Sequence, residues 1–201
     1  MKKILIALGI FLVIAIIVIG NAEDDSSITS SSSSTTSAPV SKVWSVCDFK
    51  DEFGLPTGEK YLKATATGTF NGVLGKNQDL KVEIQASEND VFIVLWEYGY
   101  SQVDALLERD QYRVTVLDQN NEKHKFYAFI REGKAYLDFD NYRLLDYKSA
   151  EDLVEILKTP GTVSFYVVQT SDEDNSYSFS VKTDGFAQLY EQILPKEEVV
   201  E

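Results

Sequence analysis

Alternation of apolar and polar residues recurs along the chain from residue 80 onward and predicts β-strands. In residues 80–86 every second side chain is apolar, and the same pattern returns over 112–116, 163–167 and 177–181. Neighbouring side chains of a strand point to opposite faces, so this period of two is typical of strands with one buried face. The polar connection at 170–175 joins the last two segments as a hairpin.

Residues 91–96 are continuously apolar, which predicts a central strand covered on both faces. Weaker strands are predicted around Trp44 and over 61–70, 126–130, 135–137 and 142–145. The number and spacing of these segments predict a mainly β fold, an antiparallel β-sandwich or barrel of about eight to ten strands.

Two short helices are predicted near the C-terminus. Ser149, followed three residues later by Asp152, offers an N-cap with an acidic first turn, and residues 159–161 end that helix. Asp184 is the predicted N-cap of the second helix, which ends at Pro195. Residues 41–195 are therefore expected to form one β-sandwich domain, and 196–201 a frayed tail.

The most apolar segment is residues 4–20, seventeen residues without a charged or polar side chain, preceded by Lys2 and Lys3. As a helix it is about 25 Å long, close to the shortest span of a hydrocarbon core of about 30 Å. We predict that residues 1–22 form an uncleaved transmembrane anchor. A cleaved secretory signal read at Gly20 and Ala22 is the alternative. Both place the following domain outside the cytoplasm, either tethered to the membrane or secreted.

A low-complexity segment separates this apolar stretch from the strands. Eleven of the twelve residues 26–37 are Ser or Thr, interrupted only by Ile28. Such a composition lacks the apolar surface that would offset the entropy lost on ordering, so residues 23–40 are predicted to be a disordered linker. Its root-mean-square span as a coil is roughly 25 Å, which holds the domain close to the membrane.

Composition and charge exclude several classes of function. Of the 201 residues, 19 are Lys or Arg and 32 are Asp or Glu, a net charge of −13. Residues 40–201 carry 17 of those positive and 29 of those negative charges, hence −12. That sign opposes binding to nucleic-acid phosphates. One Cys and one His exclude an internal disulfide framework, a cysteine zinc cluster and two-histidine metal sites.

Few residues suggest catalysis or metal binding. His124 lies in a polar connection and is interpreted as a solvated turn residue, and Cys47 as a small buried side chain. The G-x-S-x-G motif of serine hydrolases is absent from the sequence. Asp138, Asp140 and Asn141 could supply part of a Ca²⁺ site, and solvated turns are the alternative interpretation of such acidic groups.

An aromatic group follows the most apolar predicted strand. Trp96, Glu97, Tyr98 and Tyr100 are candidate partner-binding residues, because tyrosines at a strand end can contact a partner with little loss of entropy. Packing in the core and in a turn is the alternative. Residues 51–59 place Gly and Pro where a tight turn requires them.

The order of these features resembles a known group of proteins. Trp44 precedes an acidic loop, a strand ends at Gly68, and helices follow near Leu153 and Gly185. Over residues 42–194 this resembles the exported β-sandwich envelope proteins typified by the type VI secretion accessory protein VasI and, more remotely, invasion-associated protein B. The resemblance implies a fold and export, and no activity. Those proteins often carry paired cysteines, whereas this chain has Cys47 alone.

Three functions are compatible with the sequence. The first is a non-enzymatic, membrane-tethered extracytoplasmic module that binds an envelope protein or polymer. The second is a hydrolase of cell-surface polymer, which needs two carboxylates about 5 to 9.5 Å apart, drawn from Glu97, Asp138 and Asp140. The third is a carrier of a small ligand in an apolar cavity between the sheets.

Overall fold

The computed structural model describes residues 43–88, 90–103, 109–131, 136–139 and 146–195, which belong to one compact unit. The strands in these ranges are β1 Trp44–Lys50, β2 Pro56–Gly72, β3 Gly75–Ala86, β4 Val91–Glu97, β5 Ser101–Gln102, β6 Arg109–Leu117, β7 Lys123–Arg131, β8 Leu137–Phe139, β9 Thr162–Gln169 and β10 Ser176–Lys182. The helices are α1 Ala150–Lys158 and α2 Phe186–Tyr190. The predicted anchor, linker, C-terminal tail and strand at 142–145 lie outside the described residues.

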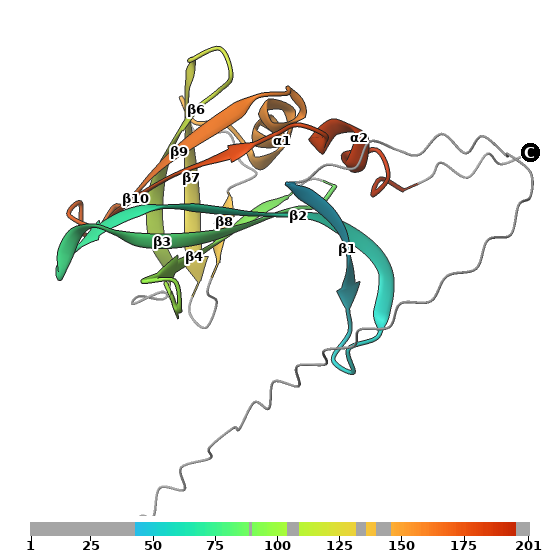
Figure 1. The fold of residues 1–201 in the computed structure, drawn as a ribbon, viewed down its shortest axis with the longest axis horizontal. Helices are drawn as coiled ribbons and strands as arrows, with labels where there is room; N and C mark the ends of the chain where they lie inside the picture. Colours follow the sequence, from blue (N-terminus) through green and yellow to red (C-terminus); the bar gives the residue numbers. More distant parts are fainter. Residues whose placement is uncertain (1–42, 89, 104–108, 132–135, 140–145, 196–201) are drawn as a thin grey trace, which may run out of the picture. The chain divides into compact units, whose positions relative to one another are not determined.

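Eight of these strands close into an antiparallel barrel (Figure 1). Their order is β2-β10-β9-β6-β7-β8-β4-β3, and β3 pairs again with β2 over ten residue pairs. The predicted mainly antiparallel β fold is confirmed, and of the two predicted architectures the chain adopts the barrel. Closure gives each of these eight strands a partner on both sides, although β8 meets β4 and β7 through two residue pairs each.

The first strand lies outside this closed ring. β1 pairs with the first part of β2, whereas β10 pairs with the last part of the same edge of β2, at residues 68–71. Figure 1 shows β1 and the start of β2 extending from the barrel as a hairpin. Trp44 connects the two regions, because its Nε1 donates to the Lys182 carbonyl at 2.8 Å and its ring meets Phe186 edge-on at 4.7 Å.

Inward-facing side chains pack into one hydrophobic cluster that fills the barrel. They include Leu62, Ile84, Ile93, Val114 and Val167, each at most 1% exposed. An eight-stranded barrel is just wide enough for its own side chains to fill. The fold is thus stabilised by a packed core, as a chain with a single cysteine and hence no internal disulfide requires.

Helix α1 follows the predicted pattern. Ser149 is the N-cap, its hydroxyl accepting from the Asp152 backbone N–H at 3.5 Å, while the Asp152 carboxylate accepts from the Ser149 backbone N–H at 2.9 Å. This reciprocal capping box fixes the start of the helix. Leu153, Val154 and Leu157 are buried in the barrel's hydrophobic cluster.

Helix α2 differs from the prediction. Gly185, with φ of 82°, is its N-cap, and no side chain caps the helix, so the assignment of Asp184 as the N-cap is wrong. The left-handed backbone at Gly185 reverses the chain and starts the helix one residue later. The helix ends at Tyr190, and residues 191–193 form turns. Within the described ranges, no helix combines the length and apolarity needed to cross a bilayer.

Candidate functional site

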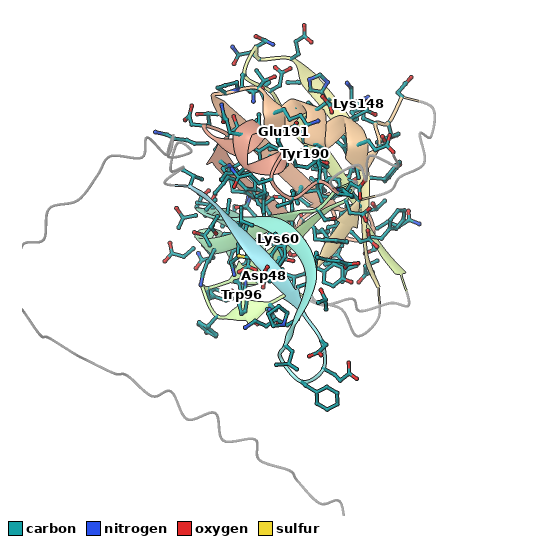
Figure 2. All side chains as sticks on the ribbon, turned by 90° about the vertical axis from the view of Figure 1, so that its right-hand side faces the viewer. Asp48, Lys60, Trp96, Lys148, Tyr190 and Glu191 are labelled. Atoms are coloured by element: carbon teal, nitrogen blue, oxygen red, sulfur yellow. The ribbon has the colours of Figure 1, made fainter. Side chains whose placement is uncertain are left out.

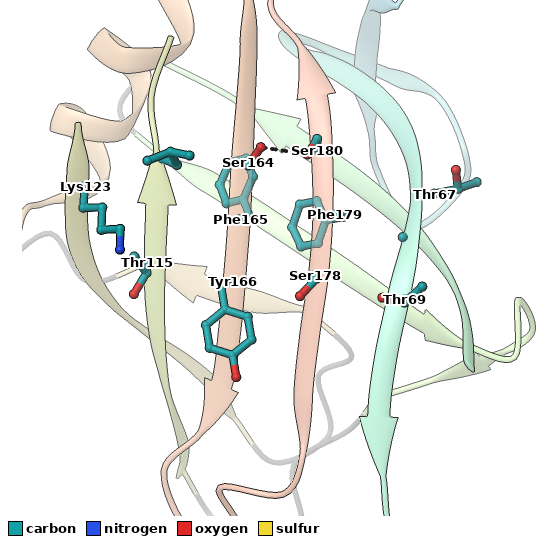
Figure 3. A pocket seen from close by; sticks show the side chains of 12 residues that line it. Thr67, Thr69, Thr115, Lys123, Ser164, Phe165, Tyr166, Ser178, Phe179 and Ser180 are labelled. Atoms are coloured by element: carbon teal, nitrogen blue, oxygen red, sulfur yellow. Dashed lines mark hydrogen bonds between the residues drawn. The ribbon is translucent and has the colours of Figure 1, made fainter. Parts of the chain in front are cut away.

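A groove of about 650 Å³ runs across the outer face of β2, β10, β9 and β6 and reaches the start of β7 (Figure 3). Its lining comprises Thr67, Gly68, Thr69, Thr115, Leu117, Lys123, Ser164, Phe165, Tyr166, Ser178, Phe179 and Ser180. Seven of these twelve residues carry a hydroxyl group. The alternation of each strand explains why these hydroxyl side chains point to solvent, because they lie between buried core positions.

The register of the barrel aligns these side chains in rows. One row runs from Thr69 through Ser178, Tyr166 and Thr115 to Lys125. The neighbouring row, two residues further along each strand, runs from Ser180 through Ser164 and Leu117 to Lys123. Side chains opposite each other on one face lie about 5 Å apart. The first row therefore offers a line of polar groups that crosses the strands, and in the second row Leu117 interrupts the polar groups.

Small side chains make the surface concave. Ser164 and Ser180 face each other across the β9–β10 pair with their Oγ atoms 2.8 Å apart (Figure 3). At Gly68, β2 and β10 approach so closely that a Cβ atom would lie 2.1 Å from the Ser178 carbonyl oxygen and 2.7 Å from Phe179 Cβ. The rings of Phe165 and Phe179 stack beneath at 4.8 Å and hold this seam from inside.

The groove differs in charge from the acidic domain around it. Lys123 is the one charged residue among those that line it. Arg113 lies further along β6 and pairs with Glu173, so its charge is already matched. The lining thus holds one positive charge and no carboxylate on a domain of net charge −12, and the nearest acidic residue along the Thr69 row is the exposed Asp79 on β3, beyond the lining.

The lining is rich in groups that form hydrogen bonds. Each Ser or Thr hydroxyl can both donate and accept a hydrogen bond, and the Tyr166 side chain is 48% exposed. The lining residues include no histidine and no carboxylate that could act as a general base for a serine. The groove can hold a ligand rich in hydroxyl groups, but its own side chains do not form a nucleophile and base pair.

The predicted aromatic group at the end of β4 is separated in the structure. Glu97 points into the barrel, where it accepts a hydrogen bond from the buried Tyr177 hydroxyl at 2.9 Å. Trp96, on the opposite face of β4, lies under the Lys81 ammonium at 5.7 Å from its ring centre. The Trp96 Nε1 atom is buried without a hydrogen-bond partner among the described residues.

The two tyrosines that follow also differ from each other. Tyr98, with φ of 54°, turns the chain and packs edge-on against Phe70 at 5.0 Å. Tyr100 is 78% exposed in the next turn. Of the four candidates, Tyr100 is thus the residue most available to a partner, while Glu97 and Tyr98 have structural contacts.

Glu97 belongs to a buried polar group at one end of the barrel. Burial raises the pKa of Tyr177 well above its ordinary value, and the nearby Glu97 carboxylate raises it further. Burial likewise raises the pKa of Tyr112, with Asp110 and Glu97 as its acidic neighbours. Alternation alone had marked both tyrosines only as inward-facing positions, because contact with Glu97 depends on the closed barrel.

The predicted calcium ligands are only partly described. Asp138 lies on β8 between the buried Leu137 and Phe139, so it faces outward. Asp140 and Asn141 lie outside the described residues, and a Ca²⁺ site there remains a prediction. Since Glu97 faces inward and Asp138 outward, these two carboxylates do not face one another across a groove.

His124 is more buried than a solvated turn residue, which corrects that interpretation. Its side chain is 12% exposed, and its Nε2 atom lies 2.8 Å from Asp118 Oδ2. The Asp118 Oδ1 atom accepts from the backbone N–H groups of Asn120 and Glu122. Ligand atoms of Asp118, Glu122 and His124 lie within 4.8 Å of one another. The hydrogen bonds of Asp118, which stabilise the turn between β6 and β7, are sufficient to explain why these three side chains lie together.

The hairpin of β1 and β2 confirms the tight turn predicted for residues 51–59. Asp51 Oδ1 accepts from the backbone N–H groups of Phe53 at 2.9 Å and Leu55 at 2.8 Å. Gly54 and Gly58 have φ of 79° and 92°. Figure 2 shows Asp48 and Lys60 on this hairpin, below Tyr190 of α2. The Cys47 thiol on β1 is partly buried, 3.9 Å from Ser45 Oγ.

Sequence reasoning missed the groove, although its signal is visible. The strings Thr65-Ala-Thr-Gly-Thr69 and Ser176-Tyr-Ser-Phe-Ser180 place hydroxyl residues at every second position. This pattern identifies a polar face on each strand. That these two faces adjoin follows from the pairing of β2 with β10, strands that lie about a hundred residues apart in the sequence.

Comparisons with protein-family models, curated proteins and solved structures give no match to the chain. Inference about function therefore depends on the groove and on the sequence itself. The resemblance to exported envelope proteins stays a prediction.

Proposed function

We propose that this chain is a membrane-tethered, extracytoplasmic binding module whose outer groove holds a component of the cell envelope. The apolar segment 4–20 and the Ser/Thr-rich linker support the tether, and the filled barrel supports a role as a rigid scaffold. The proposal assigns no reaction to the groove. Its binding residues lie on four strands fixed by backbone pairing, which gives a preorganised surface.

The observation that carries this proposal is the line of hydroxyl side chains in register across β2, β10, β9 and β6. Thr69, Ser178, Tyr166 and Thr115 come from four strands and share one row. Packing of the core does not require hydroxyl groups at these outward positions, because the solvent face of a strand tolerates most polar residues. A binding surface accounts for their concentration in this concave part of the wall.

The other two functions fit the geometry less well. A small-ligand carrier needs an apolar cavity, whereas the inward side chains of the described strands pack together in the core. A carboxylate hydrolase needs two facing acids, whereas Glu97 accepts from Tyr177 inside the barrel and Asp138 faces outward. Binding in the groove needs neither an apolar cavity nor two facing carboxylates.

Co-sedimentation with the insoluble envelope fraction tests the groove. The full chain is purified in detergent, and Ser178→Arg is compared with Ser101→Arg, which places the same side chain at an exposed position on β5, outside the groove. We expect Ser178→Arg to reduce the bound fraction at least tenfold and Ser101→Arg to leave it unchanged. Equal binding by both variants, with matched thermal unfolding, would contradict the proposal.

The location of the domain is tested separately in intact cells. The variant Cys47→Ser/Ser101→Cys has a single thiol at an exposed site. An extracytoplasmic domain predicts that a membrane-impermeant maleimide labels this thiol without lysis. Labelling that requires lysis would place the domain inside and overturn that part of the proposal.

A further inference from the structure

We infer that the ligand of the groove is a linear polysaccharide that carries anionic groups. This inference rests on the proposed function and names the ligand class of the same site. Three features carry it, namely the hydroxyl rows, the exposed ring of Tyr166 and the lysines at the β7 end.

The chemistry of the lining matches a sugar better than a protein. Protein interfaces are enriched in aromatic residues, Met and Arg and depleted in Ser. Here Thr and Ser supply six of the twelve lining residues, and Tyr166 is the one aromatic residue among them that is exposed. Hydroxyl groups pair with the hydroxyl groups of a sugar in both directions, because each is donor and acceptor. A row of them can therefore follow successive sugar units.

Tyr166 gives the groove an apolar contact. Its side chain is exposed on β9, with Ser178 opposite it on one neighbouring strand and Thr115 on the other. The ring of a tyrosine is apolar on its face and polar at its hydroxyl. A pyranose ring has the same division, with C–H groups on its face and hydroxyls on its rim. Stacking on Tyr166 would bring the rim hydroxyls toward Ser178 and Thr115.

Charge favours an acidic polymer. Both rows end on β7 at a lysine, Lys125 in one and Lys123 in the other, and both residues are exposed. Glu122 lies in the turn beyond Lys123, outside the lining. The Debye length is about 8 Å at physiological ionic strength, so distant acidic groups of the domain are largely screened at the β7 end of the groove. The carboxylate of Glu122, although adjacent in sequence, gathers with Asp118 and His124 and not with the lining. A carboxylate or phosphate of the polymer would pair with them.

The shape favours a linear chain. From Thr69 on β2 to Lys125 on β7 a row crosses four inter-strand steps. At about 4.8 Å for each step the row spans on the order of 19 Å. A single sugar would cover one part of this length, whereas a short stretch of polymer could contact the hydroxyls, Tyr166 and a lysine together.

Titration calorimetry with three polymers tests the inference, with the full chain in detergent. Polygalacturonate supplies sugar and carboxylate, dextran supplies uncharged sugar, and poly-glutamate supplies carboxylate without sugar. Tyr166→Ala and Lys123→Gln are compared with Phe53→Ala and Lys76→Gln, which change an exposed aromatic residue and an exposed lysine outside the groove. Unchanged thermal unfolding of all four variants excludes loss of folding.

We expect polygalacturonate to bind more tightly than dextran or poly-glutamate. Tyr166→Ala should weaken its binding at least fivefold, and Lys123→Gln should weaken it about threefold and reduce its dependence on salt. The two control variants should bind as the parent does. Equal binding of poly-glutamate would overturn the inference, since charge alone would then suffice, and equal binding of dextran would overturn its anionic part.

Failure of this inference is distinguishable from failure of the proposed function. If no polysaccharide binds while capture by the envelope fraction still depends on Ser178, the ligand is not a polysaccharide and the binding function stands. If capture is insensitive to Ser178→Arg, the proposed function falls, and with it the inference.

Discussion

Tyr177 on β10 donates its hydroxyl hydrogen bond to Glu97 on β4 at 2.9 Å. These strands are not neighbours, because β10 pairs with β2 and β9 while β4 pairs with β3, β5 and β8. The hydrogen bond therefore crosses the inside of the barrel near one end. It joins walls that backbone pairing does not join directly.

Tyr177→Phe removes this link and leaves the Glu97 carboxylate without that donor. We expect the free energy of unfolding to fall by about 1–3 kcal/mol, the cost of leaving a partly buried charged acceptor unsatisfied. Urea denaturation at pH 7 measures the change. Tyr100→Phe, which removes a hydroxyl from an exposed side chain, should leave stability unchanged. A loss as small as that of the control would show that the hydrogen bond does not contribute.

Stability should decline in alkali. Burial raises the pKa of Tyr190 to about 12, and the pKa values of Tyr112 and Tyr177 are also raised by burial. The folded protein thus holds these protons while the unfolded chain releases them near pH 10. The stabilisation is complete below pH 10 and is lost as pH rises through the folded-state pKa values.

Urea midpoints at pH 8, 10 and 11 measure this alkaline decline. Tyr190→Phe removes one titrating group, so its midpoint should fall less steeply above pH 10 than that of the parent protein. Tyr166→Phe, at an exposed position, provides the matched control and should retain the parent slope. Identical slopes for the parent and Tyr190→Phe would contradict a raised pKa at Tyr190.

Gly68→Ala should strain the seam between β2 and β10. The added Cβ would lie 2.1 Å from the Ser178 carbonyl oxygen and 2.7 Å from Phe179 Cβ, so the backbone must move. We expect a loss of about 1–3 kcal/mol, typical of overpacking. Thermal or urea unfolding measures it, with Thr67→Ala as the control on the exposed face of the same strand. Stability equal to that of Thr67→Ala would contradict so close an approach of the two strands at Gly68.

Asp118→Ala should destabilise the β6–β7 turn. It removes the acceptor of two backbone N–H groups, at 2.8 Å from Asn120 and 2.9 Å from Glu122, as well as the partner of His124. The hydrogen bond with His124 lowers the pKa of Asp118, so this stabilisation is present above the unfolded-state pKa and is lost as pH falls through the folded value.

Urea unfolding at pH 7 and pH 3 measures the contribution of Asp118. The parent should exceed Asp118→Ala by about 1–3 kcal/mol at pH 7, with a smaller difference at pH 3. Asp172→Ala changes an acidic turn residue of the β9–β10 hairpin. It tests whether the loss of any acidic turn residue changes the free energy of unfolding in the same way at the two pH values. A difference that grows in acid would contradict the pKa assigned to Asp118.

The sequence predicted the parts of the fold that depend on local periodicity and capping. Alternation identified the strands now seen as β3, β6, β9 and β10, and Ser149 with Asp152 identified the start of α1. Asp184 was misassigned because Asp is a common N-cap, whereas the positive φ at Gly185 that sets the start of α2 is a property of the folded chain.

The candidate site was less accessible to sequence reasoning. Trp96, Glu97, Tyr98 and Tyr100 are adjacent along the chain, yet the faces of β4 and the turn after it send them in different directions. Conversely, Thr69 and Thr115 lie 46 residues apart in the sequence and share one row of the groove. Proximity in sequence and proximity on a barrel wall are different properties.

By itself the sequence determined which side chains of each strand face the core and which face solvent, because that choice repeats every two residues. It also determined the acidic charge and the apolar N-terminal segment. Only the tertiary structure decided which polar faces adjoin and how the barrel closes. Register and closure depend on hydrogen bonds between distant strands and on packing across the core, to which every strand contributes at once.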